Sequence, residues 1–389
     1  MTENANPASP KRPTIRFDRN ELAGAFGDIG TDLPLVVAMI LVARLDCASV
    51  LIVFGLMQVL TGLYYRMPMP VQPLKAVAAL VIAQKADGNV LYGAGLAIGV
   101  TMLLLTATGL LTWLARVVPK SVVRGIQLGL GLQLATLALR KFIPADGPNG
   151  YWLAGIGFLI TLLLWGNRKY PAALFVVLVG MIYAFAFKLD WAALPSSVGF
   201  HLPQWHQPAW NDIVTGFIVL ALPQIPLSLG NSILATRQIA ADLFPERRLT
   251  IPQIGLTYSL MNLINPFFGG VPTCHGSGGM AGHYAFGART GGSVILYGSL
   301  FLGLGLFLSP GLEQIIQIFP RPILGVILFF EGLVLMSLCR DLLTAKTGLL
   351  IACLVGLAAF AIPSYGYLVG LVGGTVLARF VQKGTPKAA

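Results

Sequence analysis

Long apolar runs, separated by short loops that carry basic residues or prolines, extend over almost the whole chain. Of its 389 residues, 56% are hydrophobic and only 11% are charged. A soluble core cannot hide that much apolar surface, whereas a helix that crosses a bilayer needs about 20 apolar residues. The sequence therefore predicts an all-α integral membrane protein with about 14 spans.

The net charge of +11 does not indicate nucleic-acid binding, because the basic residues occur one to three at a time between apolar runs and form no stripe. Placing both termini in the cytoplasm puts about 19 of the 26 Lys and Arg residues on cytoplasmic loops, as the positive-inside rule requires. Arg140 and Lys141 are exceptions, because they then fall on the outer side. We expect a multi-pass protein of the cell membrane, surrounded by lipid and without a nucleic-acid partner.

The four cysteines lie in or beside apolar runs without paired spacing, which supports neither a disulfide framework nor a zinc site. Cys274, His275 and His283 lack a fourth ligand or a standard metal-site spacing. We therefore expect no metal and no cofactor.

The chain divides into two halves of seven spans each. A weak repeat at an offset of roughly 201 residues aligns PKSVVRG from Pro119 with PRPILG from Pro320. Because seven is odd, the halves must enter the membrane from opposite sides, which gives an inverted 7+7 repeat. The predicted segments are a cytoplasmic tail (1–20), the first repeat (21–187), an extracytoplasmic linker (188–210), the second repeat (211–381) and a second cytoplasmic tail (382–389).

Span 3 is interrupted by Pro68, Pro70 and Pro73 in PMPVQPLKAVAAL. Proline removes backbone donors and favours extended geometry in the preceding residue, so residues 68–73 should be extended and a helix should start near Leu74. The corresponding span 10, GGVPTCHGSGGMAGHYAF at 269–286, is also broken. A helix that begins in mid-membrane directs its unpaired N–H groups and positive dipole end at the midplane, where they can bind an anion.

In the first break, we predict that the Lys75 cation and the amides of Leu74, Lys75 and Ala76 bind the anion. Gln72 could donate its amide to the same ligand, or it could satisfy strand backbone. The alternative for Lys75 is a purely structural ion pair with Asp28 or Asp32.

The second break supplies His275, Gly276, Ser277 and Gly278, and its glycines allow the backbone to approach a ligand closely. His275 is either a proton-responsive group or a hydrogen-bonded packing residue. Gly276 stands at the position taken to be equivalent to Lys75, which leaves the cation without a counterpart in the second half.

A further set of polar residues lies at membrane depth in other spans. In the first span these are Asp28, Thr31 and Asp32; Thr31 is expected to contact substrate, and Asp28 to pair with Lys75 or to carry a coupling proton. In the eighth span, Gln224 is placed as a neutral donor to the anion, or alternatively as an interhelical hydrogen-bonding residue. Glu331 is a second candidate for proton coupling or ion pairing.

Three motifs together resemble the molybdate transporter family, a branch related to sulfate permeases. They are GAFGDIGTDLPL, PMPVQPLKA, and FGGVPTCHGSGGMAGHYAFGARTGG from Phe268 to Gly292. The resemblance implies a core of spans 1–4 and 8–11, a gate of spans 5–7 and 12–14, and a homodimer through the gate. It places the substrate between Gln72–Ala76 and His275–Gly278.

The motifs and the resemblance together predict a secondary carrier rather than an enzyme. Its expected substrate is a small tetrahedral oxyanion, molybdate first, imported by alternating access and in symport with protons. The alternatives that stay open are a carrier of sulfate or another oxyanion, a proton-coupled nucleobase carrier and an anion channel.

Overall fold

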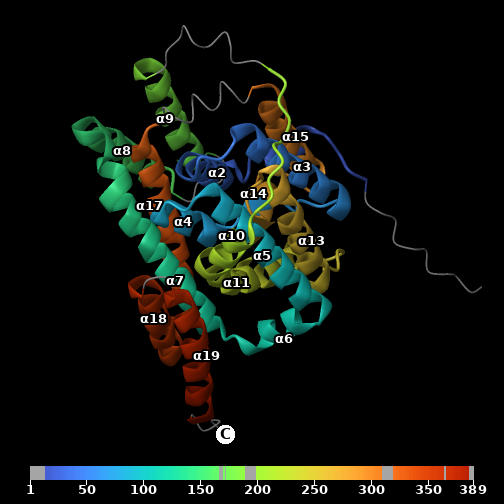
Figure 1. The fold of residues 1–389 in the computed structure, drawn as a ribbon, viewed down its shortest axis with the longest axis vertical. Coiled ribbons are helices and arrows are strands. Elements are labelled where there is room, and N and C mark those ends of the chain that lie inside the picture. The colour runs from blue at the N-terminus through green and yellow to red at the C-terminus, as the bar shows by residue number, and fades with distance from the viewer. Residues whose placement is uncertain are drawn as a thin grey trace, which may run out of the picture.

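The protein is built almost entirely of helices in the computed structural model, which describes residues 14–165, 170, 172–188, 199–308, 319–362 and 365–384 (Figure 1). The elements up to residue 187 are α1 (Arg19–Ala25), α2 (Ile29–Ala43), α3 (Cys47–Tyr65), β1 (Val71–Pro73), α4 (Lys75–Gln84), α5 (Gly88–Ala107), α6 (Leu110–Val117), α7 (Lys120–Leu137), η1 (Ala138–Phe142), η2 (Ile143–Asp146), α8 (Gly147–Leu163) and α9 (Ala172–Phe187). The elements that follow are α10 (Trp210–Gly216), η4 (Phe217–Ala221), α11 (Leu222–Leu227), η5 (Ser228–Ala235), α12 (Thr236–Leu243), α13 (Ile251–Ile264), η6 (Asn265–Phe268), β2 (Thr273–His275), α14 (Ser277–Ala285), α15 (Gly292–Phe307), α17 (Arg321–Ser337), η7 (Leu338–Leu342), α18 (Lys346–Ala361) and α19 (Gly366–Gly384).

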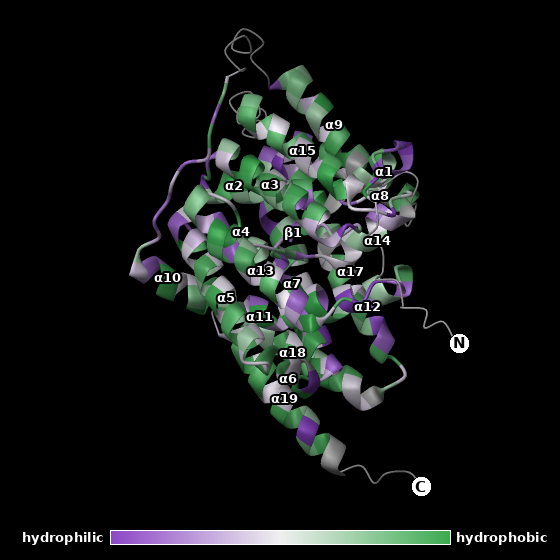
Figure 2. Cartoon of the chain, turned by 90° about the vertical axis from the view of Figure 1, so that its right-hand side faces the viewer, coloured by the Kyte–Doolittle hydropathy of each residue, from purple (hydrophilic) through white to green (hydrophobic). Residues whose placement is uncertain are grey.

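Hydrophobic residues, drawn in green, make up much of the length of these helices (Figure 2). In the described part of the chain, five helical stretches are long and apolar enough to cross a membrane, and five shorter apolar helices accompany them. On α3, Leu56, Leu60 and Leu63 are 41–49% exposed at spacings of four and three residues, so they form one apolar outward stripe. This pattern fits a lipid-facing surface, while the count of about fourteen spans stays a prediction.

Several predicted boundary segments fall partly outside the described residues. Residues 1–13 of the first tail, 189–198 of the linker and 385–389 of the second tail belong to this group.

The first predicted span is not one continuous helix. It is divided between α1 and α2, and Asp28 is the N-cap residue of α2. The interruption lies where Gly27 packs against α14: a Cβ on Gly27 would lie 2.5 Å from the carbonyl carbon of Gly282. Gly24 and Gly27 are three residues apart, a spacing that indicates close helix packing, and both allow a close backbone approach beside the helix break.

Both proline- and glycine-rich breaks have the geometry that the sequence predicts. Residues 71–73 form β1, Leu74 is an extended N-cap, and α4 starts at Lys75. In the second half, β2 is followed by the extended N-cap Gly276 and by α14. The predicted helix start near Leu74 is therefore confirmed.

A single irregular helix runs through α10, η4, α11, η5 and α12. It contains two π-helical segments, and Pro223 and Pro226 lie in α11 between them. Proline cannot donate to the helical ladder, and π-segments often accompany functional sites. The irregular stretch packs on α4, which brings Gln224 to the start of that half-helix.

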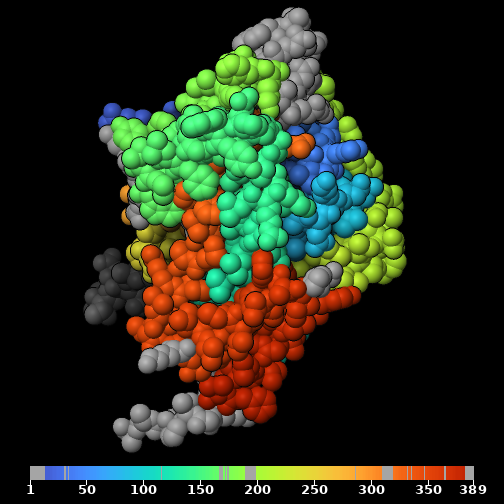
Figure 3. Space-filling model, turned by 90° about the vertical axis from the view of Figure 1, so that its left-hand side faces the viewer, coloured from blue at the N-terminus to red at the C-terminus, as the bar shows by residue number. Residues whose placement is uncertain are grey.

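The remaining helices pack in two sets. In one, α3 packs on α15 and α5 packs on α10 and α13; in the other, α7 packs on α17 and α18, and α18 packs on α19. Figure 3 shows the second set on one face, with α7 and α8 in teal and green beside the orange and red α17–α19. Gly131 and Gly332 face each other reciprocally across α7 and α17: a Cβ on either would lie 2.5–2.6 Å from the carbonyl oxygen of the other.

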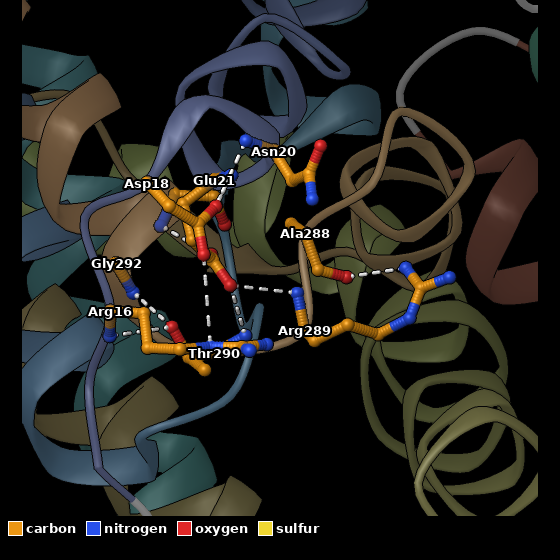
Figure 4. A network of polar contacts seen from close by, with 9 residues as sticks. Arg16, Asp18, Asn20, Glu21, Ala288, Arg289, Thr290 and Gly292 are labelled. Carbon is orange, nitrogen blue, oxygen red and sulfur yellow. Dashed lines mark hydrogen bonds and ion pairs between the residues drawn. The ribbon is translucent and has the colours of Figure 1, made fainter.

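The segment that follows α14 is anchored by a buried carboxylate near the N-terminus (Figure 4). Glu21 is 1% exposed, and its Oε1 accepts hydrogen bonds from the backbone amides of Arg289 and Thr290 at 2.9 and 2.8 Å. Its Oε2 accepts from the Ser293 amide at 3.0 Å, in the first turn of α15. A carboxylate at a helix N-terminus is favoured by the helix dipole, so this contact fixes α15 to α1.

Candidate anion-binding site

The two broken spans meet each other in the interior. Strands β1 and β2 pair antiparallel in the register Val71–His275, Gln72–Cys274 and Pro73–Thr273. The amide of Leu74, which caps α4, donates to the carbonyl of Pro272 at 3.0 Å. Each strand leads within two residues into a half-helix, so the pairing places the starts of α4 and α14 in one buried region.

Two side-chain amides hold the strand backbones, and neither was predicted from the sequence. Gln58 of α3 donates to the Val71 carbonyl at 2.7 Å and accepts from the Val71 amide at 2.9 Å. Asn262 of α13 makes the same two-way contact with Thr273, at 2.6 and 2.9 Å. The signal that could have found them is a lone Gln or Asn inside an apolar run, 13 or 11 residues before the strand residue that it holds. Such a buried amide needs partners.

Lys75 is the first residue of α4 and is half-buried. It interacts electrostatically with Asp32, which is fully buried, as is Asp28 at 3% exposure. The hydroxyl of Tyr297 in α15 lies 3.5 Å from Asp32 Oδ2, near enough for a long hydrogen bond. The cation predicted from the first break therefore lies near the carboxyl group of Asp32, which in turn interacts with Asp28.

Gln72 donates from Nε2 to both carboxylate oxygens of Asp28, at 2.7 Å each. Its side chain also covers Gly276: a Cβ on Gly276 would overlap Gln72 Oε1. A Cβ on Gly279, in the first turn of α14, would overlap Asp28 Oδ2. In this conformation the Gln72 amide thus donates its hydrogen bonds to a carboxylate of the protein itself. That carboxylate lies against the start of α14.

Gln224 closes the start of α4. Its Oε1 accepts from the Ala76 amide at 2.9 Å and from the Val77 amide at 3.3 Å. Its Nε2 donates to Ser228 Oγ at 3.1 Å, and Ser228 in turn lies 2.8 Å from the Tyr258 hydroxyl. Gln224 therefore reaches the predicted site, but in this conformation it accepts from helix amides and donates to Ser228.

The start of α14 is more open. Ser277 is half-buried and donates to Asn231 Oδ1 at 3.3 Å, a long bond that leaves it loosely held. Gly278 is exposed, and a Cβ there would meet nothing within 4 Å. A ligand can therefore approach the backbone of α14 at Ser277 and Gly278.

His275 is fully buried, and both ring nitrogens have protein partners. Nε2 lies 2.8 Å from Thr257 Oγ1 and Nδ1 lies 3.4 Å from the Pro70 carbonyl, while Tyr65 packs edge-on against the ring. Nδ1 faces a carbonyl oxygen, which can only accept, so this nitrogen is placed to donate. These contacts match the hydrogen-bonded packing residue that was the alternative for His275.

The equivalence drawn between Lys75 and Gly276 needs correction. Gly276 is the N-cap of α14, as Leu74 is of α4, so the helix starts make Lys75 equivalent to Ser277. The offset of 201 misses this by one residue, because the second break reaches its helix one position later. The cation of the first half therefore has a hydroxyl as its counterpart.

Two predicted residues cannot be placed in full. Thr31 lies in α2 and Glu331 lies in α17, but their side chains are outside the part of the chain that the structure describes.

Paired discontinuous helices inside a bundle of apolar helices are typical of a membrane transporter. The chain matches the family described as "Molybdate transporter of MFS superfamily" over residues 20–134 and 216–335. It belongs to the molybdate transporter family, whose members are transporters and not enzymes.

Two curated relatives come from Arabidopsis thaliana. Molybdate transporter 1 is 35% identical over 83% of this chain and 80% of the relative, and Molybdate transporter 2 is 34% identical over 83% and 79%. Among solved structures, the transmembrane domain of the cyanobacterial bicarbonate transporter BicA matches with a TM-score of 0.66 and 16% identity, over 94% of this chain and 98% of that one. The murine anion transporter Slc26a9 in its inward-facing state matches with a TM-score of 0.72 and 13% identity, over 96% and 70%. These structures show the fold that the chain shares.

Proposed function

We propose that this protein is a secondary active transporter that imports molybdate by alternating access around a site between the starts of α4 and α14. The observation that carries the proposal is the β1–β2 pairing, which brings two interior helix N-termini and Lys75 together. Two dipole ends and a cation can offset a dianion, and backbone amides and hydroxyls can replace its lost hydration. The molybdate transporter relatives support the choice of oxyanion.

The proposed site consists of residues from both breaks and from two neighbouring helices. Lys75 supplies charge, while Ser277 and Gly278 present the open helix start. Leu74, Ala76, His275 and Gly276 shape the backbone around it, and Thr31, Gln72 and Gln224 complete the proposed set. Binding would require Gln72 or Gln224 to turn from its present partner to the anion.

The proposed architecture is an inverted repeat of 21–187 and 211–381, divided into a core and a gate. Two pairs of residues support it at the same offset of 201. Pro119 and Pro320 are the N-caps of α7 and α17, and Gly131 and Gly332 face each other across these two helices. The two packing sets correspond to core and gate, and relative movement of these sets would expose the site to each side in turn.

Proton symport is part of the proposal, because import of a dianion against a negative interior costs about 2.3 kcal/mol per charge per 100 mV. Asp28 and Asp32 are buried carboxyls one helical turn apart, beside Lys75. Two such groups can hold a proton between them. We assign Asp28 as the first candidate for coupling, with Glu331 as the second. Cytoplasmic termini and a homodimer through the gate complete the proposal.

The test is competitive uptake in proteoliposomes with molybdate, tungstate, sulfate and uracil, with and without a pH gradient. We expect molybdate and tungstate to compete, and an inward proton gradient to accelerate uptake. Competition by uracil without molybdate uptake would overturn the proposal, and uncoupled flux that follows voltage would indicate a channel.

The structure gives a specific reason to include uracil in the competition experiment. A nucleobase site generally needs a carboxylate that faces the ring N–H groups. The breaks themselves contain no acidic residue, which by itself argues against such a site. The structure brings the carboxylate of Asp28 to Gln72 from outside the breaks. An anion is therefore favoured over a nucleobase by the Lys75 cation and by the molybdate transporter relatives, and the competition experiment distinguishes the two substrates.

A further inference from the structure

Four basic residues line one cavity about 320 Å³ in volume, which we call the four-cation cavity. They come from four separate elements: Arg44 follows α2, Lys85 follows α4, Lys141 lies in η1, and Arg321 begins α17. No acidic residue lines the cavity within the described chain. It lies between the C-terminal ends of α2 and α4 on one side and η1 and α17 on the other.

The four cations are all exposed, and none of them makes an ion pair with another described residue. Exposed like charges tolerate each other because water screens them. A cavity with low-dielectric walls that is lined by one sign of charge concentrates counter-ions and speeds their arrival. The lining therefore fits a hydrated anion.

Helix dipoles favour three of these cations and oppose the fourth. Arg44 and Lys85 are at the C-caps of α2 and α4, where a cation is favoured. Both have left-handed backbone with φ of 53°, a conformation that usually selects glycine. Lys141 lines the cavity from the last turn of η1, where a cation is also favoured, whereas Arg321 opens α17, where a cation opposes the dipole. The charge itself is the shared property.

The position of the cavity connects it with the proposed site. Helix α4 has 10 residues, so it carries Lys75 at one end and Lys85 about 15 Å away at the other. Under the proposed orientation the cavity faces the outside, so all four of its cations, Lys141 among them, lie on the side that the positive-inside rule disfavours.

A second cavity, of about 530 Å³, lies at the opposite end of α7 and is lined by Lys120, Arg124 and Arg237. Here Asp341 pairs with Lys120 at 2.6 Å and with Arg124 at 2.7 Å. One carboxylate thus neutralises part of the charge. The four-cation cavity has no such group in the described chain, so the positive field is stronger on that side.

We propose that the four-cation cavity is an outer capture site, which holds the tetrahedral dianion weakly and raises its rate of delivery to the start of α4. The inference rests on the proposed transport function and on its orientation. It assigns these four residues to substrate collection, separate from the site between the half-helices.

The experiment measures the KM for molybdate uptake by the full chain in phosphatidylcholine proteoliposomes. The variant is Lys141→Gln with Arg321→Gln, which avoids the left-handed positions. The matched controls are Arg140→Gln, a neighbouring exposed cation that does not line the cavity, and the charge-conserving pair Lys141→Arg with Arg321→Lys. We expect KM to rise about threefold to tenfold at low ionic strength with Vmax unchanged, and the difference to vanish near 1 M salt, where the Debye length is about 3 Å.

Equal KM and equal salt dependence in the variant and in Arg140→Gln would overturn the proposal. A difference that appears only when phosphatidylglycerol is added would assign the cavity to lipid headgroups and would also overturn it. Monodisperse elution and an unchanged melting temperature establish folding of each variant. If wild-type protein takes up no molybdate but takes up sulfate, the proposed substrate fails while the cavity is tested with sulfate in the same way.

Discussion

The half-helices α4 and α14 begin alike but are completed differently. Each follows a three-residue strand, and each strand is held by one side-chain amide, Gln58 or Asn262. At α4, the Gln224 carbonyl occupies the amides of the first turn. At α14, Gly278 faces open space. To the proposed anion site, α4 therefore contributes chiefly the Lys75 charge, whereas α14 contributes accessible backbone.

The largest expected effect follows from removing that charge. Lys75→Gln should weaken molybdate binding about tenfold to a hundredfold, because a charge-assisted contact to the anion is worth about 1.5–3 kcal/mol. Binding to purified protein measures it, and Arg140→Gln, which removes an exposed cation outside both proposed anion sites, is the matched control. Unchanged affinity would make Lys75 a structural partner of Asp28 and Asp32, and α4 would lose its assigned role.

Substitution of Gly276 tests how tightly the two breaks are joined. A methyl group on Gly276 would displace Gln72 and its two bonds to Asp28, so Gly276→Ala should cost about 2 kcal/mol of stability. Thermal unfolding in detergent measures the loss. Gly278→Ala is the control, because its methyl group meets open space and alanine favours a helix. Equal melting temperatures for the two variants would show that the breaks are not in the contact described.

The closure of α4 is tested by Gln224→Met, which keeps the length of the side chain but removes its acceptor. The amides of Ala76 and Val77 would lose their partner, at a cost of about 1–2 kcal/mol. Gln224→Glu restores an acceptor, so its melting temperature should return toward wild type while its negative charge suppresses anion uptake. A Gln224→Met protein with wild-type stability and lost uptake would assign Gln224 directly to the substrate.

The smallest expected effect belongs to Ser277→Ala. Its bond to Asn231 is long, so stability should hardly change, while loss of a donor at the open helix start should raise KM about two- to threefold. Asn231→Ala, which removes only the partner, is the comparison. A KM change in Asn231→Ala alone would move the contact with substrate from α14 to the irregular helix.

The breaks were the most predictable part of this protein. Prolines at 68, 70 and 73 fix extended backbone and end donation to a helix, so the start of α4 followed from local chemistry. The division of the first span at residues 26–28 was not predicted, because glycine spacing indicates close packing but not a break. The hydrogen-bond partners of Gln72 and Gln224 could not be predicted either, because a buried amide can bond equally well to a ligand or to groups of its own protein.

The sequence by itself determined that the chain lies in a membrane, that two spans are interrupted, and that a lysine opens one half-helix. These properties depend on apolar run length and on proline, which act over a few residues. Only the tertiary structure decided that the breaks pair as β1 and β2, that Asp28 reaches Gln72, and that four distant cations surround one cavity. Residues as far apart in the sequence as Arg44 and Arg321 line the same cavity, and no local preference encodes which distant residues will meet.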